Sequence, residues 1–363
     1  MASEAYAQRL THRRRPSEYI IPVVGLVLVG LVIAWLIVNL VQAPDQFSRV
    51  FLIGITNGSL YALVALGYTL VYGILELINF AHGDVFMLGG MIAAALIGTG
   101  GFLFIPGFDL DQWGTPGASL GALIPAILVC LAVSIIACGL INVSVERIAY
   151  KPLRNAPRLA PLITAIGMSF ILQNVAIVWK GTETVSVNQT LPTGDVFAIG
   201  DVHYTWDRLF GVLVTVPVLV LLVWLVQYTR QGKAMRATAQ DKDAAAMMGI
   251  DVNRTISFTF LIAGGLAGAA GVIFAFYYTT VRFDTGFTLG LIAFTAAVLG
   301  GIGNLPGAVL GAMIIGLLQA FNEGLSWHAP GPAWTTSIVF GILILILVFR
   351  PQGLLGEQTP EGG

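Results

Sequence analysis

The chain has 363 residues, of which 56% are hydrophobic and only 10% are charged, and its mean hydropathy is +0.85. A soluble domain carries about 25% charged residues, so this composition excludes a water-soluble protein and predicts a polytopic, all-α membrane protein. The formal net charge of −1 identifies no partner, and we expect none to be a nucleic acid.

Apolar runs long enough for membrane-spanning helices occur along the whole chain, and we predict about ten of them. They cover residues 19–41, 48–73, 80–105, 119–143, 160–179, 208–228, 256–280, 286–302, 305–321 and 333–349. The eighth and ninth are short and are separated by GGIGNLPG (Gly300–Gly307), so these two could be interrupted or re-entrant. The first is longer than the hydrophobic part of a signal peptide, so we predict that it is retained.

Lysine and arginine are distributed unevenly among the predicted loops. Fourteen of the 18 fall within residues 1–18, 144–159, 229–255 and 350–363. Basic residues collect in cytoplasmic loops, so these segments, and with them both termini, are predicted to be cytoplasmic. The predicted organisation is a tail (1–18), a transmembrane domain (19–350) and a second tail (351–363).

Two longer outer segments are predicted near 104–118 and 180–207. The second contains NQT (Asn188–Thr190), which matches a glycosylation triplet and carries little weight alone.

Glycines fall into two groups with different expected roles. Gly264, Gly265, Gly268 and Gly271 lie within one span, where they are expected to let helices pack closely. Gly300, Gly301, Gly303 and Gly307 are expected to shape the turn between the eighth and ninth spans.

Familiar catalytic and metal-binding motifs are missing from the sequence. It has no P-loop, H-E-x-x-H, G-x-S-x-G or cysteine cluster, and Cys130 and Cys138 are interpreted as packing residues. Most predicted spans lack the carboxylates that a proton-driven pump needs. We therefore expect a non-enzymatic protein that binds no metal and no cofactor itself and takes its energy from elsewhere.

The sequence ELINFAHGDVFMLGG (Glu76–Gly90) is unusually polar for its apolar surroundings. With no further ligands and no relay elsewhere in the chain, a metal or proton site is disfavoured. Gly83 permits a helix break, and polar side chains could satisfy the freed backbone groups or line a path. The candidate residues of a translocation path or gate are Asn57, Ser59, Tyr61, Asn79, His82 and Asp84. For each of them, simple packing or hydrogen bonding is the alternative.

The predicted cytoplasmic loop 229–255 is the most charged stretch. Lys233–Met248 is predicted as one helix, with Gly249 as its C-cap. Helical spacing puts Lys233, Arg236 and Gln240 on one face and Met235, Ala239 and Met247 on another. DAAAMMG (Asp243–Gly249) fits the pattern acidic-Ala-Ala-x-x-x-Gly. The alternative to a special role for this segment is a solvated cytoplasmic helix that bears positive-inside charges.

That pattern resembles the "EAA" loop with which membrane subunits of ABC importers dock on their ATPases. The resemblance implies a docking surface made of Lys233, Arg236, Gln240, Asp241, Asp243, Ala244, Ala245 and Gly249.

Four blocks in order resemble the LivH-type permease subunit of branched-chain amino acid ABC importers. They are NGSLYALVALGYTLVYGILELINFAHGDVFMLGG (Asn57–Gly90), ERIAYKPLRNAPRLAPLITAIGMSFILQN (Glu146–Asn174), GKAMRATAQDKDAAAMMGI (Gly232–Ile250) and FTAAVLGGIGNLPGAVLGAMIIGLLQA (Phe294–Ala320). The resemblance covers roughly residues 48–355, and the N-terminal extension and the long outer segments exceed the family's compact form.

The resemblance implies a permease domain in the bacterial cytoplasmic membrane that imports branched-chain amino acids. It implies three kinds of partner: a related second permease subunit in a heterodimer, two ABC ATPase subunits that use ATP and Mg, and an external solute-binding protein. Urea or short-amide permeases of the same family remain an alternative, as does a secondary transporter or channel that works alone.

Overall fold

The structure is a computed structural model that describes residues 17–97, 120–154, 156–157, 159–187, 191–192, 194–200, 202–350 and 352–356. Most of the two predicted tails, the outer segment 104–118 and the triplet Asn188–Thr190 lie outside the described residues.

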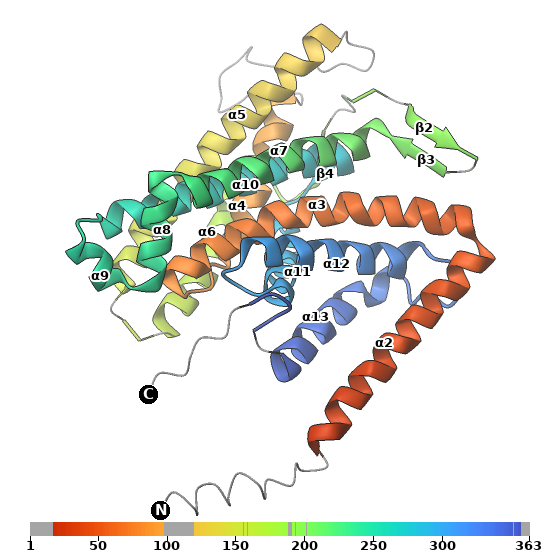
Figure 1. Ribbon diagram of the computed structural model, residues 1–363. Coiled ribbons are helices and arrows are strands. Elements are labelled where there is room, and N and C mark those ends of the chain that lie inside the picture. Colours follow the sequence, from red (N-terminus) through yellow and green to blue (C-terminus); the bar gives the residue numbers. More distant parts are fainter. Residues whose placement is uncertain are drawn as a thin grey trace, which may run out of the picture.

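Each of the ten predicted spans overlaps a helix in the described part of the chain (Figure 1). These helices are α2 (Ser17–Gln42), α3 (Pro44–Leu75), α4 (Ala81–Ile97), α5 (Leu120–Val145), α6 (Leu159–Lys180), α7 (Trp206–Tyr228), α10 (Val252–Tyr278), α11 (Thr285–Gly300), α12 (Leu305–Gly324) and α13 (Pro332–Phe349).

Among the described residues, seven helices are long and apolar enough to cross a membrane by length and composition: α3, α5, α6, α7, α10, α12 and α13. The apolar stretches Val29–Gln42, Ala81–Ile97 and Thr285–Gly300 are shorter. The polytopic all-α class is thus confirmed, while the count of ten crossings and the cytoplasmic termini stay predictions.

Shorter elements join the long helices. They are the π-helix η1 (Glu146–Tyr150), the 3₁₀ turn η2 (Lys151–Leu153), α8 (Arg230–Gln240), α9 (Lys242–Met247) and the strands β1 (Val185–Ser186), β2 (Asp195–Ile199), β3 (Val202–Thr205) and β4 (Thr280–Val281). β2 pairs antiparallel with β3, and β1 pairs antiparallel with β4. The β2–β3 hairpin and the α8–α9 pair lie at opposite ends of the bundle (Figure 1); we call these the hairpin end and the α8–α9 end.

The interior of the bundle is built around α3, α4 and α10. Every residue of α4 is buried, and α3 and α10 are buried along most of their lengths. α5, α6, α7 and α13 instead present large apolar side chains outward, among them Ile136, Ile163, Val220 and Ile344. An apolar periphery of this kind is what a lipid environment requires.

Close approach at glycines explains why α10 can be central. A Cβ atom added to Gly271 would lie 2.5 Å from the backbone nitrogen of Gly90, and one added to Gly264 would lie 2.5 Å from the carbonyl oxygen of Cys138. A side chain at Gly268 would collide with the backbone of Ser134. The packing role predicted for the glycines of this span is therefore confirmed.

The helix break lies seven residues before the position predicted for it. α3 ends at Leu75, and its C-cap, Glu76, has a left-handed φ of 56° and a backbone N–H that donates to Tyr72 O over 2.7 Å. Gly83, where the break was predicted, lies inside α4. A Cβ atom there would collide with the backbone of α11 at Gly286 and Gly290. The prediction was wrong because this glycine serves close packing and not a change of chain direction.

The turn between α11 and α12 uses the predicted glycines. Gly301 and Gly303 have φ values of 107° and 97°, which only glycine adopts readily. Gly300 and Gly307 face each other without room for a Cβ atom on either. The predicted role of these glycines in shaping the turn is confirmed, and the turn lies at the α8–α9 end.

Candidate functional site

A cleft of about 360 Å³ opens toward the hairpin end between α3, α10, α11 and α12. Its lining consists of Tyr61, Phe274, Tyr278, Arg282, Asp284, Thr285, Thr288, Leu289 and Gln319, and we call it the Arg282 cleft. Tyr61 donates a hydrogen bond to Gln319 Oε1, and Tyr278 donates to Asn57 Oδ1 over 3.5 Å. One predicted path residue, Tyr61, therefore lines the cleft, and a second, Asn57, bonds to a lining residue. The other lining residues were not predicted.

An ion pair stands at this cleft, in the loop that joins α10 to α11. Arg282 Nε donates to Asp284 Oδ1 over 2.6 Å, and Arg282 Nη2 contacts the second carboxylate oxygen. The side chains are 52% and 37% exposed. Hydrogen bonding from the guanidinium holds the pKa of the Asp284 carboxyl below its usual value. The loop thus presents a full positive and a full negative charge side by side.

His82, Asp84 and Ser59 are buried in helix contacts. The His82 ring lies edge-on to Tyr68, with ring centroids 4.8 Å apart, and fits because a side chain at Gly67 would occupy its place. Gln173 Nε2 donates to Asp84 Oδ1 over 3.1 Å, which links α4 to α6. Ser59 Oγ donates to Ile55 O within its own helix. All three side chains are buried among these neighbours, and their role in a path or gate stays a prediction.

Asn79 lies in the break between α3 and α4 and joins a chain of buried hydrogen bonds. Tyr150 donates to Asn79 Oδ1 over 2.9 Å, and Asn79 Nδ2 lies 3.5 Å from Asn142 Oδ1. Asn142 Nδ2 in turn donates to Phe260 O over 2.7 Å. This chain ties the break to η1, α5 and α10, as expected where polar side chains compensate for interrupted backbone hydrogen bonding.

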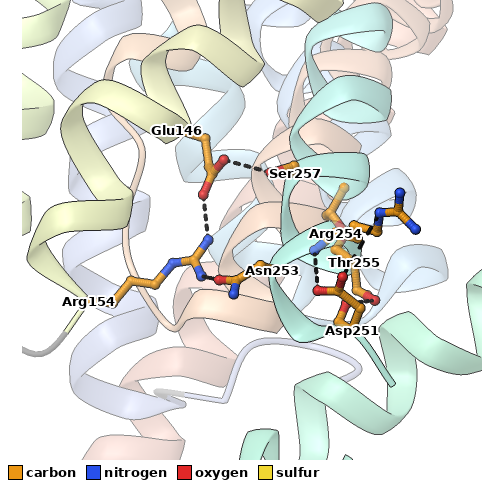
Figure 2. Close-up of polar contacts among 8 residues, drawn as sticks. Glu146, Arg154, Asp251, Asn253, Arg254, Thr255 and Ser257 are labelled. Carbon is orange, nitrogen blue, oxygen red and sulfur yellow. Dashed lines mark hydrogen bonds and ion pairs between the residues drawn. The ribbon is translucent and has the colours of Figure 1, made fainter. Parts of the chain in front are cut away.

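A second group of polar contacts, the Glu146 cluster, comprises Glu146, Arg154, Asn253 and Ser257 (Figure 2). Arg154 donates to Glu146 Oε1, Ser257 Oγ donates to Glu146 Oε2 over 2.8 Å, and Arg154 Nη1 donates to Asn253 Oδ1 over 2.5 Å. The Glu146 side chain is fully buried. The cluster fixes the η1–η2 segment to the first turns of α10.

The sequence analysis missed the Glu146 cluster. One signal was available, because Glu146 is the only acidic residue in the basic segment 144–159. A lone acidic residue among four basic ones indicates an ion pair, but sequence alone does not show that Asn253 and Ser257, a hundred residues away, complete it.

The predicted single helix Lys233–Met248 is wrong, because the chain forms two helices, α8 and α9. Asp241 is extended (φ −156°, ψ 114°), and its side chain accepts hydrogen bonds from Asp243 N and Ala244 N. Aspartate is a strong N-cap and starts α9 anew. The predicted C-cap is confirmed: Gly249 has a φ of 83°, and Ile250 N donates to Ala245 O.

The break at Asp241 separates the predicted docking residues. Lys233, Gln240, Asp241, Asp243 and Gly249 are exposed, whereas Ala245 is buried. Arg236 donates to Val226 O and Gln227 O at the end of α7, and thereby holds α8 in place.

Two methionines that were predicted to share a helix face, Met235 and Met247, also separate. Met235 is buried, while Met247 and Met248 are 82% and 84% exposed at the end of α9. Met235 and Met247 therefore do not share a face. An exposed apolar pair among charged residues is a surface suited to contact with another protein.

A cleft of about 460 Å³ adjoins α8 and connects it to the interior of the bundle. Its walls come from α3 (Thr69, Gly73), the α7–α8 junction (Val226, Met235) and the α11–α12 turn (Asn304). Movement of α8 would therefore act directly on α3 and on that turn.

The described residues contain no group of three or more His, Cys, Asp or Glu side chains placed to hold a metal ion. Cys130 and Cys138 are free and buried in this part of the chain.

Comparison with known proteins identifies relatives of this chain over most of its length. Residues 50–348 match the family model described as branched-chain amino acid transport system / permease component. The chain is 39% identical over 311 residues to the high-affinity branched-chain amino acid transport system permease protein BraD of Pseudomonas aeruginosa, covering 85% of this chain and 95% of that protein.

Other relatives carry the same description. LivH of Salmonella typhimurium is 36% identical over 313 residues, covering 85% of this chain and 95% of LivH. A probable LivH of Methanocaldococcus jannaschii is 28% identical over 315 residues, covering 83% of this chain and 90% of that protein. The predicted resemblance is confirmed: the chain belongs to the family of branched-chain amino acid transport permeases, and is a multi-pass membrane protein of a non-enzymatic transport family.

Proposed function

We propose that this chain is the membrane-spanning permease subunit of an ATP-driven ABC importer in the bacterial cytoplasmic membrane. It forms the translocation path for branched-chain amino acids, which an external solute-binding protein delivers. Its partners are a related second permease subunit, in a heterodimer, and two ABC ATPase subunits that bind ATP and Mg; the chain itself binds no cofactor.

The α8–α9 pair is the observation that carries this proposal. It presents exposed charged side chains, including Lys233 on α8 and Asp243 on α9, and the exposed apolar pair Met247 and Met248 at the end of α9. Charged groups fix the register of a protein contact, and a desolvated apolar centre supplies affinity. A channel or transporter working alone has no need of such a surface.

The predicted orientation agrees with this assignment. Nine of the ten basic residues that the predicted cytoplasmic loops hold from Arg147 to Arg350 are in the described part of the chain. They belong to segments that meet near α8 and α9, through the Arg154–Asn253 and Leu354–Leu299 hydrogen bonds among others. The hairpin end then faces outward, and the solute-binding protein would release its ligand over the Arg282 cleft.

Reconstitution tests the proposal directly. The complete complex in vesicles should accumulate L-leucine only when ATP and the binding protein are both present. Accumulation by this chain alone without ATP would contradict the proposal and favour a stand-alone transporter. Accumulation of urea or acetamide without leucine would favour the amide-permease alternative.

Docking is tested with two variants in the exposed part of α9. Asp243→Lys reverses a surface charge, and Gly249→Trp adds bulk at a position with open space but a left-handed backbone. We expect the amount of ATPase that co-purifies with either variant to fall about tenfold, which corresponds to about 1.4 kcal/mol. Arg254→Ala, on the same side of the molecule but outside α8 and α9, is the control and should co-purify the ATPase normally.

A further inference from the structure

We infer that the Arg282 cleft is a weak binding site for zwitterionic α-amino acids with apolar side chains, and that Arg282 and Asp284 recognise their two charges. This inference rests on the proposed function, because it assigns the first contact of the transported solute with the permease. It also gives a physical reason to choose amino acids over urea and short amides.

The charged pair keeps bonding capacity that a zwitterion can use. A guanidinium has five N–H donors, and the pair with Asp284 uses one on Nε and one on Nη2. The remaining donors on the two terminal nitrogens are available to a carboxylate. The free lone pairs of Asp284 can accept from an ammonium group at the same time. An ion pair with both partners half exposed thus matches the adjacent charges of an α-amino acid.

An apolar wall lies beside this pair. Phe274 and Tyr278 have ring centroids 4.5 Å apart, and Leu289 lines the same cleft. Phe274 is itself held by an edge-on contact with Phe86, with centroids 5.5 Å apart. A branched aliphatic side chain would lie against these groups while its charges stay at the mouth. The volume of about 360 Å³ falls at the lower end of the range for small-molecule sites.

The exposure of the ion pair implies weak binding of the amino acid. Weak binding suits a transport step that must also release its solute. Charges in contact with water are screened, so each contributes little affinity. Urea carries no charge and would leave both groups of the pair without a new partner. Discrimination between a zwitterion and a neutral amide therefore needs no deep pocket.

A cysteine placed in the cleft reports occupancy. Thr288 is exposed and lines the cleft, and the native Cys130 and Cys138 are buried. We would assemble T288C with its partner subunits in right-side-out vesicles, without binding protein, and measure its rate of labelling by a membrane-impermeant maleimide. The control is E183C, at an exposed position outside the cleft.

Four probes separate the features of the ligand: L-leucine, 4-methylpentanoate (no ammonium group), 3-methylbutylamine (no carboxylate) and urea. Leucine should slow labelling of T288C about threefold at twice its dissociation constant, and the other three should protect much less. Equal protection by all four, protection of E183C as well, or no labelling of T288C from outside would overturn the inference.

A second substitution in the T288C background tests which residue of the pair binds which charge of the ligand. In a T288C background, R282Q should abolish protection by leucine, and D284N should make leucine no better than 4-methylpentanoate. R208Q removes an arginine at the same end that bonds to His203 O and does not line the cleft, and should leave protection unchanged. Unchanged protection in R282Q would overturn the role of Arg282.

Uptake into the same vesicles, with ATP and binding protein, keeps the two proposals apart. ATP-driven leucine uptake without protection of T288C overturns the cleft and leaves the proposed function intact. Protection without any ATP-driven uptake supports the cleft and contradicts the proposed function.

Discussion

The two ends of the bundle use the same kinds of polar group in opposite ways. At the α8–α9 end, the Glu146 carboxylate is fully buried and both of its oxygens accept hydrogen bonds. At the hairpin end, Arg282 and Asp284 pair with each other and remain open to water. Buried, satisfied polar groups fix helices in one arrangement, whereas exposed ones stay available to a ligand. The comparison predicts a structural role for Glu146 and its partners, and recognition of a ligand by Arg282 and Asp284.

The largest effect on stability is expected from removal of the Glu146 carboxylate. Glu146→Ala leaves the Arg154 guanidinium and Ser257 without their main partner and should lower the free energy of unfolding by about 3 kcal/mol. Unfolding can be followed with a thiol-reactive dye, since Cys130 and Cys138 are buried in the folded chain.

The matched control for Glu146 is an exposed ion pair at the start of α10, three residues before Ser257. Arg254→Ala breaks an ion pair with Asp251 whose side chains are 88% and 58% exposed, so it should change the melting temperature little. Equal destabilisation by both variants would mean that burial does not determine how much these two ion pairs contribute to stability.

A smaller effect is expected from Tyr150→Phe. The substitution removes only the hydroxyl that donates to Asn79 Oδ1 and leaves a buried amide oxygen short of one partner, at a cost of about 1–2 kcal/mol. Tyr278→Phe is the counterpart at the hairpin end, where the hydrogen bond to Asn57 is long. The same dye assay should rank Tyr150→Phe as the more destabilising change; the reverse order would contradict the comparison.

Much of the fold was predictable because long apolar runs in the sequence identify membrane helices. Nine of the ten apolar runs correspond to helices within a few residues, and the third, 80–105, ends outside the described residues. The packing glycines of α10 and the glycine turn after α11 were also identified. The errors concern single side chains that direct the backbone. The Asp241 N-cap splits the predicted docking helix. Gly83 packs against α11, and the helix break occurs at Glu76 instead.

The candidate site was predictable only in part, because a cleft joins segments far apart in the chain. Asn57 and Tyr61 were selected for their polarity within a span, and they do contribute to the Arg282 cleft or to its lining residues. Gln319 and Tyr278 carry no local signal that links them to Tyr61. His82 and Asp84 looked functional because they are polar in an apolar run, yet in the structure they meet buried neighbours, Tyr68 and Gln173.

The N-cap of α9, Asp241, lies at the α8–α9 end but is exposed. It therefore tests the effect of burial separately from the effect of position in the bundle. Asp241→Ala removes two hydrogen bonds to the start of α9 and should cost about 1 kcal/mol of local helix stability. Because the site is exposed, we expect faster amide hydrogen exchange in α9 and no change in global melting. Asp241→Asn keeps an acceptor and should restore slow exchange. Global unfolding of D241A would indicate that the cap is part of the buried network.

The smallest effect is expected from acid, at the hairpin end. Arg282 holds the pKa of Asp284 below the ordinary carboxyl value of about 4. A lowered pKa in the folded state means that the pair is present above that ordinary value and is lost only as the pH falls through the lowered one. From about pH 7.5 to about pH 5, the charges of the cleft are therefore constant. Leucine protection of T288C should then be flat across this range, provided that the labelling rate is normalised to E183C at each pH. A protection that rises or falls with a midpoint inside the range would show that a titrating group other than the Arg282–Asp284 pair governs binding, and would contradict the zwitterion-matching arrangement on which the contrast between the two ends depends.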